Sequence, residues 1–371
     1  MIFASIICLS LVLAFANGAN DNFKGVATLY GSKTTGFNTA IWLATITTAV
    51  GSILALILAK GLLASFSGKG LVPTEVVADP RFAVAVALGS SATVLLASRL
   101  GFPVSTTHAL IGALVGTGLL AASGQLNLDK LGKGFLWPLL SSPLLAVVAA
   151  MTLYPFLRRL RLRMGVGEET CICVENAIVA VMPGRHDCAE ALRSISMPKL
   201  NVNPSCRTRY SGQVLGIQAR QLLDAAHFLS AGAVSLARGL NDTPKIAAIL
   251  LLGGGTSATA LIGVGVMIAV GGLVFSRRVA DTMSHRVTDM NSGQGFTANI
   301  ITSGLVIAAS KLGLPVSTTH VSCGSLFGIG AVSGGAHWRT ITSILTAWLV
   351  TLPLAGIIAA GSFWSLGFFS L

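Results

Sequence analysis

Two short polar sequences occur twice in this chain, each time in apolar surroundings. Residues 99–108 read RLGFPVSTTH, and residues 311–320, 212 positions later, read KLGLPVSTTH. The sequence GANDNFK at 18–24 corresponds to GLNDTPK at 239–245, 221 positions later. An internal repeat of this kind predicts a fold of two related halves. Polar residues repeated at membrane depth are typical of transporters whose binding site lies where the halves meet.

The composition predicts a protein that crosses a membrane several times. Of 371 residues, 53% are hydrophobic and 10% are charged, whereas soluble domains carry about 25% charged residues. Runs shorter than about 20 residues predict broken or re-entrant helices, and so do the short segments 21–31 and 243–252. The apolar runs are 2–17, 39–64, 82–98, 104–122, 135–157, 222–238, 256–276, 296–310, 316–334 and 341–369.

Residues 158–221 interrupt the apolar pattern and hold a cluster of arginine and lysine residues. Because such clusters usually stay cytoplasmic, we expect a first transmembrane repeat at 1–157, a cytoplasmic insert at 158–221 and a second transmembrane repeat at 222–371. About five spans in each half would invert the second repeat relative to the first and place both termini outside. Residues 1–16 lack a basic start, so we assign them to the fold rather than to a signal peptide. Topology accounts for the net charge of +12, and we expect no nucleic-acid binding.

The insert contains most of the cysteines, together with two expected strands at 170–175 and 177–182. A metal or redox site would have to use Cys171, Cys173, Cys188 and Cys206. Their spacing departs from the paired Cys-x₂-Cys units of zinc sites, and thiols stay free in a reducing compartment, so we favour inert thiols. Cys8 and Cys323 lie in apolar runs, where we expect them to pack.

Each Leu-Gly-x-Pro-Val-Ser-Thr-Thr-His sequence predicts a helix, a tight turn and a second helix. Gly101 and Gly313 suit a helix C-cap, while Pro103 and Pro315 suit the start of the next helix. At the membrane surface the turn would be only a capped connection, but at mid-membrane the helix N-terminus and its hydroxyls would bind an anion. Because both halves carry the sequence, we favour two hairpin tips that meet around one anion. The hydroxyl residues are Ser105, Thr106, Thr107, Ser317, Thr318 and Thr319.

Other polar residues of the repeat keep two interpretations each. His108 and His320 would donate to an oxyanion or carry a proton, or they would form an ordinary interhelical contact. Arg99 and Lys311 would attract an anion, or they would cap a helix or mark a membrane edge.

Asp21 and Asp242 occupy equivalent positions in apolar segments, where an aspartate is costly and is functional by default. With Asn20 and Asn241 they offer hard oxygen ligands that suit a small cation. The glycines before them would let the helix unwind. The alternative is a helix N-cap by Asn20 or Asp21.

Together these sequences resemble the PiT family of inorganic phosphate transporters. That family carries a duplicated Gly-Ala-Asn-Asp-Val-Ala-Asn-type signature and a duplicated Pro-Val-Ser-Thr-Thr-His sequence. The resemblance covers both repeats but not the insert, and it implies an all-α fold of two inverted repeats that takes up phosphate with Na⁺ or H⁺ by alternating access. It also implies that Asn20, Asp21, Asn241 and Asp242 line the cation and substrate sites, and that the six hydroxyl residues hold the anion.

Two departures from the family pattern concern charge. Lys24 and Lys245 stand where the signature ends in asparagine, and Thr48 stands where relatives often carry glutamate. We hypothesise that each ammonium takes the place of a coupling cation or pairs with the anion. A donor-rich pocket would then favour sulfate over phosphate, so sulfate transport stays the first alternative.

Two further classes remain open: an anion-sensing membrane protein that signals through the insert, and a cation transporter that uses the aspartates. The sequence contains no P-loop, so we expect no ATP hydrolysis. It shows no nucleophile–base pair or metal triad, so we expect no other enzymatic activity. We expect no cofactor beyond Na⁺ as a coupling ion. A bacterial inner membrane is the expected location, and a homodimer is expected by analogy with other transporters.

Overall fold

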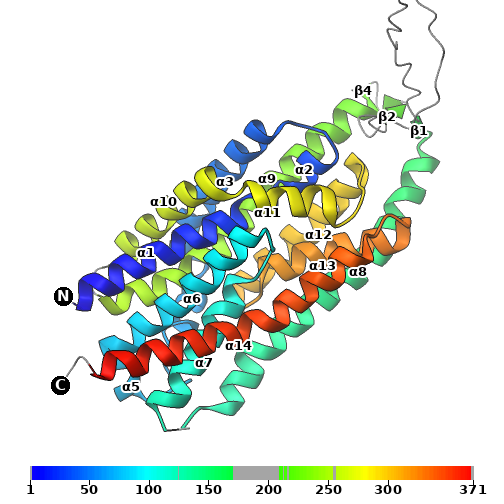
Figure 1. Ribbon diagram of the computed structural model, residues 1–371. Coiled ribbons are helices and arrows are strands. Elements are labelled where there is room, and N and C mark those ends of the chain that lie inside the picture. Colours follow the sequence, from blue (N-terminus) through cyan, green and yellow to red (C-terminus); the bar gives the residue numbers. More distant parts are fainter. Residues whose placement is uncertain are drawn as a thin grey trace, which may run out of the picture.

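Long helices lie side by side in an elongated bundle (Figure 1). The computed structural model describes residues 2–123, 125–169, 209–211, 213–214, 217–253 and 256–368. The helices of the first half are α1 (Ile2–Asp21), α2 (Ala27–Gly31), α3 (Phe37–Leu58), α4 (Lys60–Ser65), α5 (Thr74–Ala78), α6 (Pro80–Leu100), α7 (Thr106–Ala121) and α8 (Trp137–Arg163). Those of the second half are α9 (Ala219–Leu250), α10 (Ser257–Phe275), α11 (Arg277–Asp281), α12 (Ser292–Lys311), α13 (Thr318–Ser333) and α14 (Trp338–Phe368). Short 3₁₀ turns η1 (Asn22–Gly25) and η3 (Leu251–Gly253) and π turns η2 (Lys130–Leu136) and η4 (Thr282–Arg286) join them.

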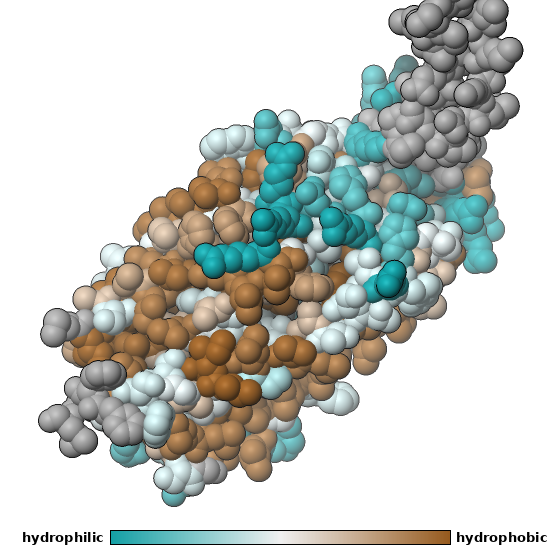
Figure 2. All heavy atoms as spheres, in the orientation of Figure 1, coloured by the Kyte–Doolittle hydropathy of each residue, from teal (hydrophilic) through white to brown (hydrophobic). Residues whose placement is uncertain are grey.

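The surface of the bundle suits a lipid environment. In the described part of the chain, six helices are long and apolar enough to cross a membrane. Large apolar side chains point outward from several of them, as Ile57 (73% exposed) and Leu349 (78% exposed) do. Figure 2 shows apolar residues over most of this face and hydrophilic residues gathered over α11, toward one end of the bundle. The expectation of an all-helical protein that crosses the membrane several times is confirmed.

Each Pro-Val-Ser-Thr-Thr-His sequence forms the tip of a helical hairpin, as predicted. Gly101 ends α6 with φ = 76°, and Gly313, after α12, has φ = 69°. This left-handed conformation favours glycine because a Cβ atom would be strained there. The second helices start later than predicted. The prolines stay in the extended connection, and the caps are Ser105 and Ser317, whose hydroxyls accept from the N–H groups of His108 and His320.

The Asn-Asp sequences differ in backbone structure between the halves. In the first half α1 ends at Asp21 and gives way to η1, so the predicted break is present, although it follows the aspartate and Asp21 makes no side-chain cap. In the second half α9 runs without interruption from Ala219 to Leu250, with Pro244 inside it. The expected half-helix at 243–252 is therefore wrong. A tightly packed helix tolerates Pro244 because proline removes a single backbone donor.

The two halves interleave instead of folding side by side. Helix α14 packs against the α6–α7 hairpin of the first half, and α8 packs against the α12–α13 hairpin of the second. Helices α3 and α9 cross where Gly51 faces the Leu236 carbonyl and Gly239 faces the Thr48 carbonyl, with 2.1 Å between each ideal Cβ position and the oxygen. Only glycine permits this approach, as is common between membrane helices.

Both chain ends lie at one end of the bundle, and the short strands lie at the other (Figure 1). The strands form two antiparallel pairs, β1 (Gly167–Glu169) with β2 (Arg209–Ser211) and β3 (Gln213–Val214) with β4 (Ile217–Gln218). They add a little β structure to the expected all-α fold. The expected strands at 170–175 and 177–182 and the cysteines Cys171, Cys173, Cys188 and Cys206 lie outside the described residues. Cys8 is exposed and Cys323 is buried.

Candidate functional site

The two hairpin tips meet at the centre of the bundle and exchange contacts through two lysines. Lys24 donates to Val104 O (2.8 Å) of the first tip and to Thr319 Oγ1 (2.8 Å) of the second. Lys245 donates to Val316 O (2.6 Å) of the second tip and to Thr107 Oγ1 (2.8 Å) of the first. Each lysine therefore bonds a carbonyl of its own half and a hydroxyl of the other half.

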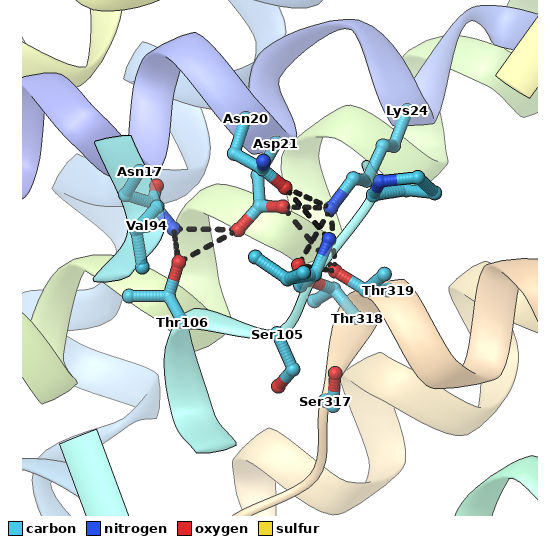
Figure 3. A network of polar contacts seen from close by, with 12 residues as sticks. Asn17, Asn20, Asp21, Lys24, Val94, Ser105, Thr106, Ser317, Thr318 and Thr319 are labelled. Carbon is cyan, nitrogen blue, oxygen red and sulfur yellow. Dashed lines mark hydrogen bonds and ion pairs between the residues drawn. The ribbon is translucent and has the colours of Figure 1, made fainter. Parts of the chain in front are cut away.

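Asp21 is the centre of a dense buried network, which Figure 3 shows from close by. One carboxylate oxygen accepts from Asn17 Nδ2 (2.8 Å) and from Thr106 Oγ1 (3.0 Å). The other accepts from Thr319 Oγ1 (3.2 Å) and forms an ion pair with Lys24. Asp21 is 1% exposed and Lys24 is 4% exposed. A buried carboxylate needs this many partners because burial removes its hydration.

Asp242 has the equivalent position but looser contacts. Its carboxylate accepts from Asn241 Nδ2 (3.0 Å) and from Thr318 Oγ1 (3.2 Å). The Lys245 Nζ atom lies 3.5 Å from Asp242 Oδ1, beyond ordinary hydrogen-bond length. The two aspartate sites thus share their residue types and differ in how closely the lysine approaches.

Asn20 and Asn241 fasten the helices to the hairpin tips. Asn20 donates to Ser98 Oγ (3.0 Å) and to Phe102 O (2.9 Å), and it accepts from the Val104 backbone N–H (3.1 Å). Asn241 donates to Val316 O (3.2 Å) and accepts from Ser310 Oγ (3.3 Å). The structure therefore brings the Asn-Asp-x-x-Lys sequences and the hairpin tips into one cluster, although 69 or more positions separate the bonded residues along the chain.

The remaining predicted residues lie beside this cluster. The Ser105 and Ser317 hydroxyls cap their helices and stand apart from the Asp21 network in Figure 3. The rings of His108 and His320 lie 4.3 Å apart, and the His320 ring stacks on Trp348 at 3.8 Å. His108 Nδ1 and His320 Nε2 are buried without a hydrogen-bond partner in the described part of the protein. Two orphaned ring nitrogens next to the tips leave polar capacity for a ligand.

Arg238 belongs to the site, although sequence reasoning missed it. It is 1% exposed, and its guanidinium donates to Asn17 Oδ1 (3.2 Å), Asn22 Oδ1 (2.9 Å) and Thr48 Oγ1 (3.2 Å). Two signals could have found it: it is a charged residue at the end of an apolar run, and it is the repeat counterpart of Asn17, 221 positions earlier.

The cations expected at the hairpin ends lie outside the buried cluster. Arg99 and Lys311 are the basic residues of the last turns of α6 and α12, and both are exposed. The Arg99 carbonyl accepts from the Arg278 guanidinium. Thr282 Oγ1 donates to Gly101 O (2.9 Å), so α11 and η4 hold the first tip from outside.

An apolar helical bundle with two hairpin tips and paired charged residues buried at its centre defines a polytopic membrane transporter. The pattern that describes the Phosphate transporter family matches residues 17–359. The chain belongs to this family, as the repeated sequences predicted, and it is an inorganic phosphate transporter rather than an enzyme.

Individual relatives agree with this assignment. The chain is 27% identical to a phosphate permease homologue of Pyrococcus horikoshii, over 95% of this chain and 96% of that protein. It is 26% identical to inorganic phosphate transporter 2-1, chloroplastic, of Arabidopsis thaliana, over 95% of this chain and 70% of that protein. A solved structure described as the sodium-dependent phosphate transporter has the same fold, with a TM-score of 0.76, 21% identity and 99% coverage of both chains.

Proposed function

We propose that phosphate binds where the two hairpin tips meet and crosses the membrane there by alternating access. The observation that carries this proposal is the reciprocal pair of contacts from Lys24 to Thr319 and from Lys245 to Thr107. These contacts join the two halves at one place, so a ligand bound there would contact both halves. The anion contacts would come from Ser105, Thr106, Thr107, Ser317, Thr318 and Thr319. His108 and His320 would add ring nitrogens.

The burial of the cluster supports a closed state as one step of this cycle. Thr319 is 0% exposed and Lys245 is 1% exposed, so a bound anion would be sealed from water on both sides. Different contacts close the two tips. Trp348 Nε1 donates to Pro103 O (3.0 Å) at the first tip, whereas Gly313 at the second packs against the backbone of Gly61. Movement of one hairpin alone would then open one side.

A cavity of about 280 Å³ with both polar and apolar walls lies against the first tip and supports a route to the site. It is lined by Gly101 and Phe102 of the tip, by Thr282, and by the exposed guanidinium groups of Arg286 and Arg339. Two cations at the mouth of a cavity raise the local concentration of anions. We infer that phosphate passes through this cavity on the side of the bundle that bears β1–β4.

The proposal also covers the membrane topology of the two repeats and the location of the protein. Helix α11 and turn η4 of the second half hold the first tip, and α4 of the first half holds the second tip. This reciprocal arrangement supports two repeats of inverted topology. The arginines beside β1–β4 favour the cytoplasm for that end and the outside for both termini. We propose the inner membrane of a bacterium as the location, residues 158–221 as a cytoplasmic insert, and a homodimer as the assembly.

Uptake of labelled phosphate into proteoliposomes tests the function. We expect saturable uptake that unlabelled sulfate blocks poorly. Replacing both cross-tip hydroxyls, Thr107→Val with Thr319→Val, should abolish most of this uptake. The control Thr152→Val removes an exposed hydroxyl that bonds only its own helix and should leave uptake unchanged. Transport of sulfate in place of phosphate would refute the proposed substrate, and full activity of the double variant would refute the proposed site.

A further inference from the structure

The Lys24 ammonium lies inside a cage of oxygen atoms. Its Nζ atom donates to Asn20 Oδ1 (2.7 Å), Val104 O (2.8 Å) and Thr319 Oγ1 (2.8 Å), and it pairs with Asp21 Oδ1. The amide carbonyl, the main-chain carbonyl and the carboxylate are pure acceptors, and together with the hydroxyl they offer four oxygens to the three ammonium protons. Carboxylate, carbonyl and hydroxyl oxygens around one point are also the ligands that hard metal cations prefer. The lysine thus occupies a cation position with a charge that belongs to the chain.

Lys245 and Arg238 occupy oxygen clusters of the same chemistry. Lys245 Nζ has Val316 O, Thr107 Oγ1 and, at 3.5 Å, Asp242 Oδ1 around it. Arg238 faces two amide oxygens and one hydroxyl, and it forms no ion pair with any carboxylate in the described part of the chain. Its Nε is buried without a partner. A buried guanidinium without a counter-ion is costly, so the cluster is stabilised by any negative charge that arrives nearby.

The charges of the cluster do not balance. Its buried cations are Lys24, Lys245 and Arg238, and its buried carboxylates are Asp21 and Asp242. The cluster therefore has one excess positive charge. A singly charged oxyanion neutralises it, whereas an added metal cation would raise the excess in a poorly hydrated interior, where like charges repel strongly.

We propose that the three fixed side-chain cations take the place of coupling metal ions, so that this chain carries singly charged phosphate without sodium. The inference rests on the proposed phosphate site and states which ions that site accepts. The proton that would accompany phosphate then travels on the anion itself as dihydrogen phosphate. Sulfate, a dianion, leaves the cluster with an excess negative charge and binds less well.

The wild-type protein alone provides the first test. We expect the same rate of phosphate uptake into proteoliposomes in sodium chloride and in choline chloride. We also expect the melting temperature of the purified protein in detergent to be the same in both salts and to rise on addition of phosphate. A severalfold stimulation of uptake by Na⁺, or a rise in melting temperature with Na⁺, overturns the inference. Because the melting measurement does not need transport, it tests sodium binding even if the proposed phosphate uptake fails.

Variants that empty the cages provide the second test. Lys24→Asn with Lys245→Asn removes both ammonium groups and leaves their oxygens facing two vacated positions. Na⁺ should then raise the melting temperature and stimulate uptake severalfold. Arg238→Asn, which copies the repeat counterpart Asn17, should also become stabilised by Na⁺. The control Lys60→Asn removes an exposed lysine and should stay insensitive to Na⁺. If the folded double variant remains insensitive as well, the lysines do not stand in for cations.

Discussion

Neutralising the two central aspartates should cost different amounts of stability, because only one of them touches its lysine. Asp21 accepts hydrogen bonds from Asn17, Thr106 and Thr319 in addition to the ion pair with Lys24. Breaking a contacting buried ion pair costs about 3–5 kcal/mol. In Asp21→Asn the new amide N–H₂ must also face a hydrogen-bond donor, because donors surround both carboxylate oxygens of Asp21.

Asp242→Asn should cost less. Its lysine lies 3.5 Å away, and its two hydrogen bonds come from Asn241 and Thr318. Losing hydrogen bonds to a charged group costs about 1.5–3 kcal/mol. The two replacements should therefore differ by about 1–2 kcal/mol, with Asp21→Asn the more destabilising.

The assay is unfolding of both variants in detergent micelles, followed by tryptophan fluorescence. Adding Lys24→Gln to Asp21→Asn should recover part of the loss, because the second change removes the unpaired cation. The same double change at Asp242 and Lys245 should recover less. Equal losses at the two aspartates, or a larger loss at Asp242, would refute the argument from lysine distance.

Three shorter predictions concern packing, capping and access. Gly239→Ala should destabilise the protein by about 1–3 kcal/mol, because the new Cβ would lie 2.1 Å from the Thr48 carbonyl. Gly232→Ala on the same helix meets only ordinary contacts and should be tolerated. Thermal unfolding of the two variants compares their stability. Ser317→Ala should cost about 1 kcal/mol by removing the cap of α13, which the same assay measures against Ser365→Ala at an exposed helix position. Arg286→Gln with Arg339→Gln should raise the apparent KM for phosphate on the β1–β4 side, because two cations that attract the anion are removed. The KM should also depend less on salt, since salt screens exposed charges. An unchanged KM in oriented vesicles would contradict the proposed route.

The hairpins were predictable from the sequence because their signals are local. Gly101 and Gly313 adopt the left-handed conformation that follows many helices, which glycine takes without strain. A proline two residues later is part of the same local signal. Ser105 and Ser317 cap the next turn for the same reason. The duplication further predicted that the two hairpin tips meet, and in the structure they contact each other. That they hold one anion between them stays a prediction.

The Asn-Asp sequences show that local sequence signals do not predict every helix break. Both copies carry Asn-Asp-x-x-Lys, with Phe23 in the first copy where the second has Pro244. The copy with the proline stays helical in α9, whereas α1 breaks after Asp21. In a membrane helix the neighbouring segments decide whether freed backbone groups are satisfied, so the residue types of a short segment do not by themselves fix where its helix breaks. Arg238 was missed for the same reason: its oxygen partners come from α1, η1 and α3, far away in the sequence.

The sequence by itself determined the membrane environment, the two-fold repetition, the hairpins and the residue types at the site, because composition, caps and repeats are properties of short segments. Only the tertiary structure decided which half each lysine contacts, how closely it approaches its aspartate, and that a third buried cation joins the cluster. Those outcomes depend on side chains that come together from distant positions in the sequence. The distances between these side chains decide whether a buried charge is balanced.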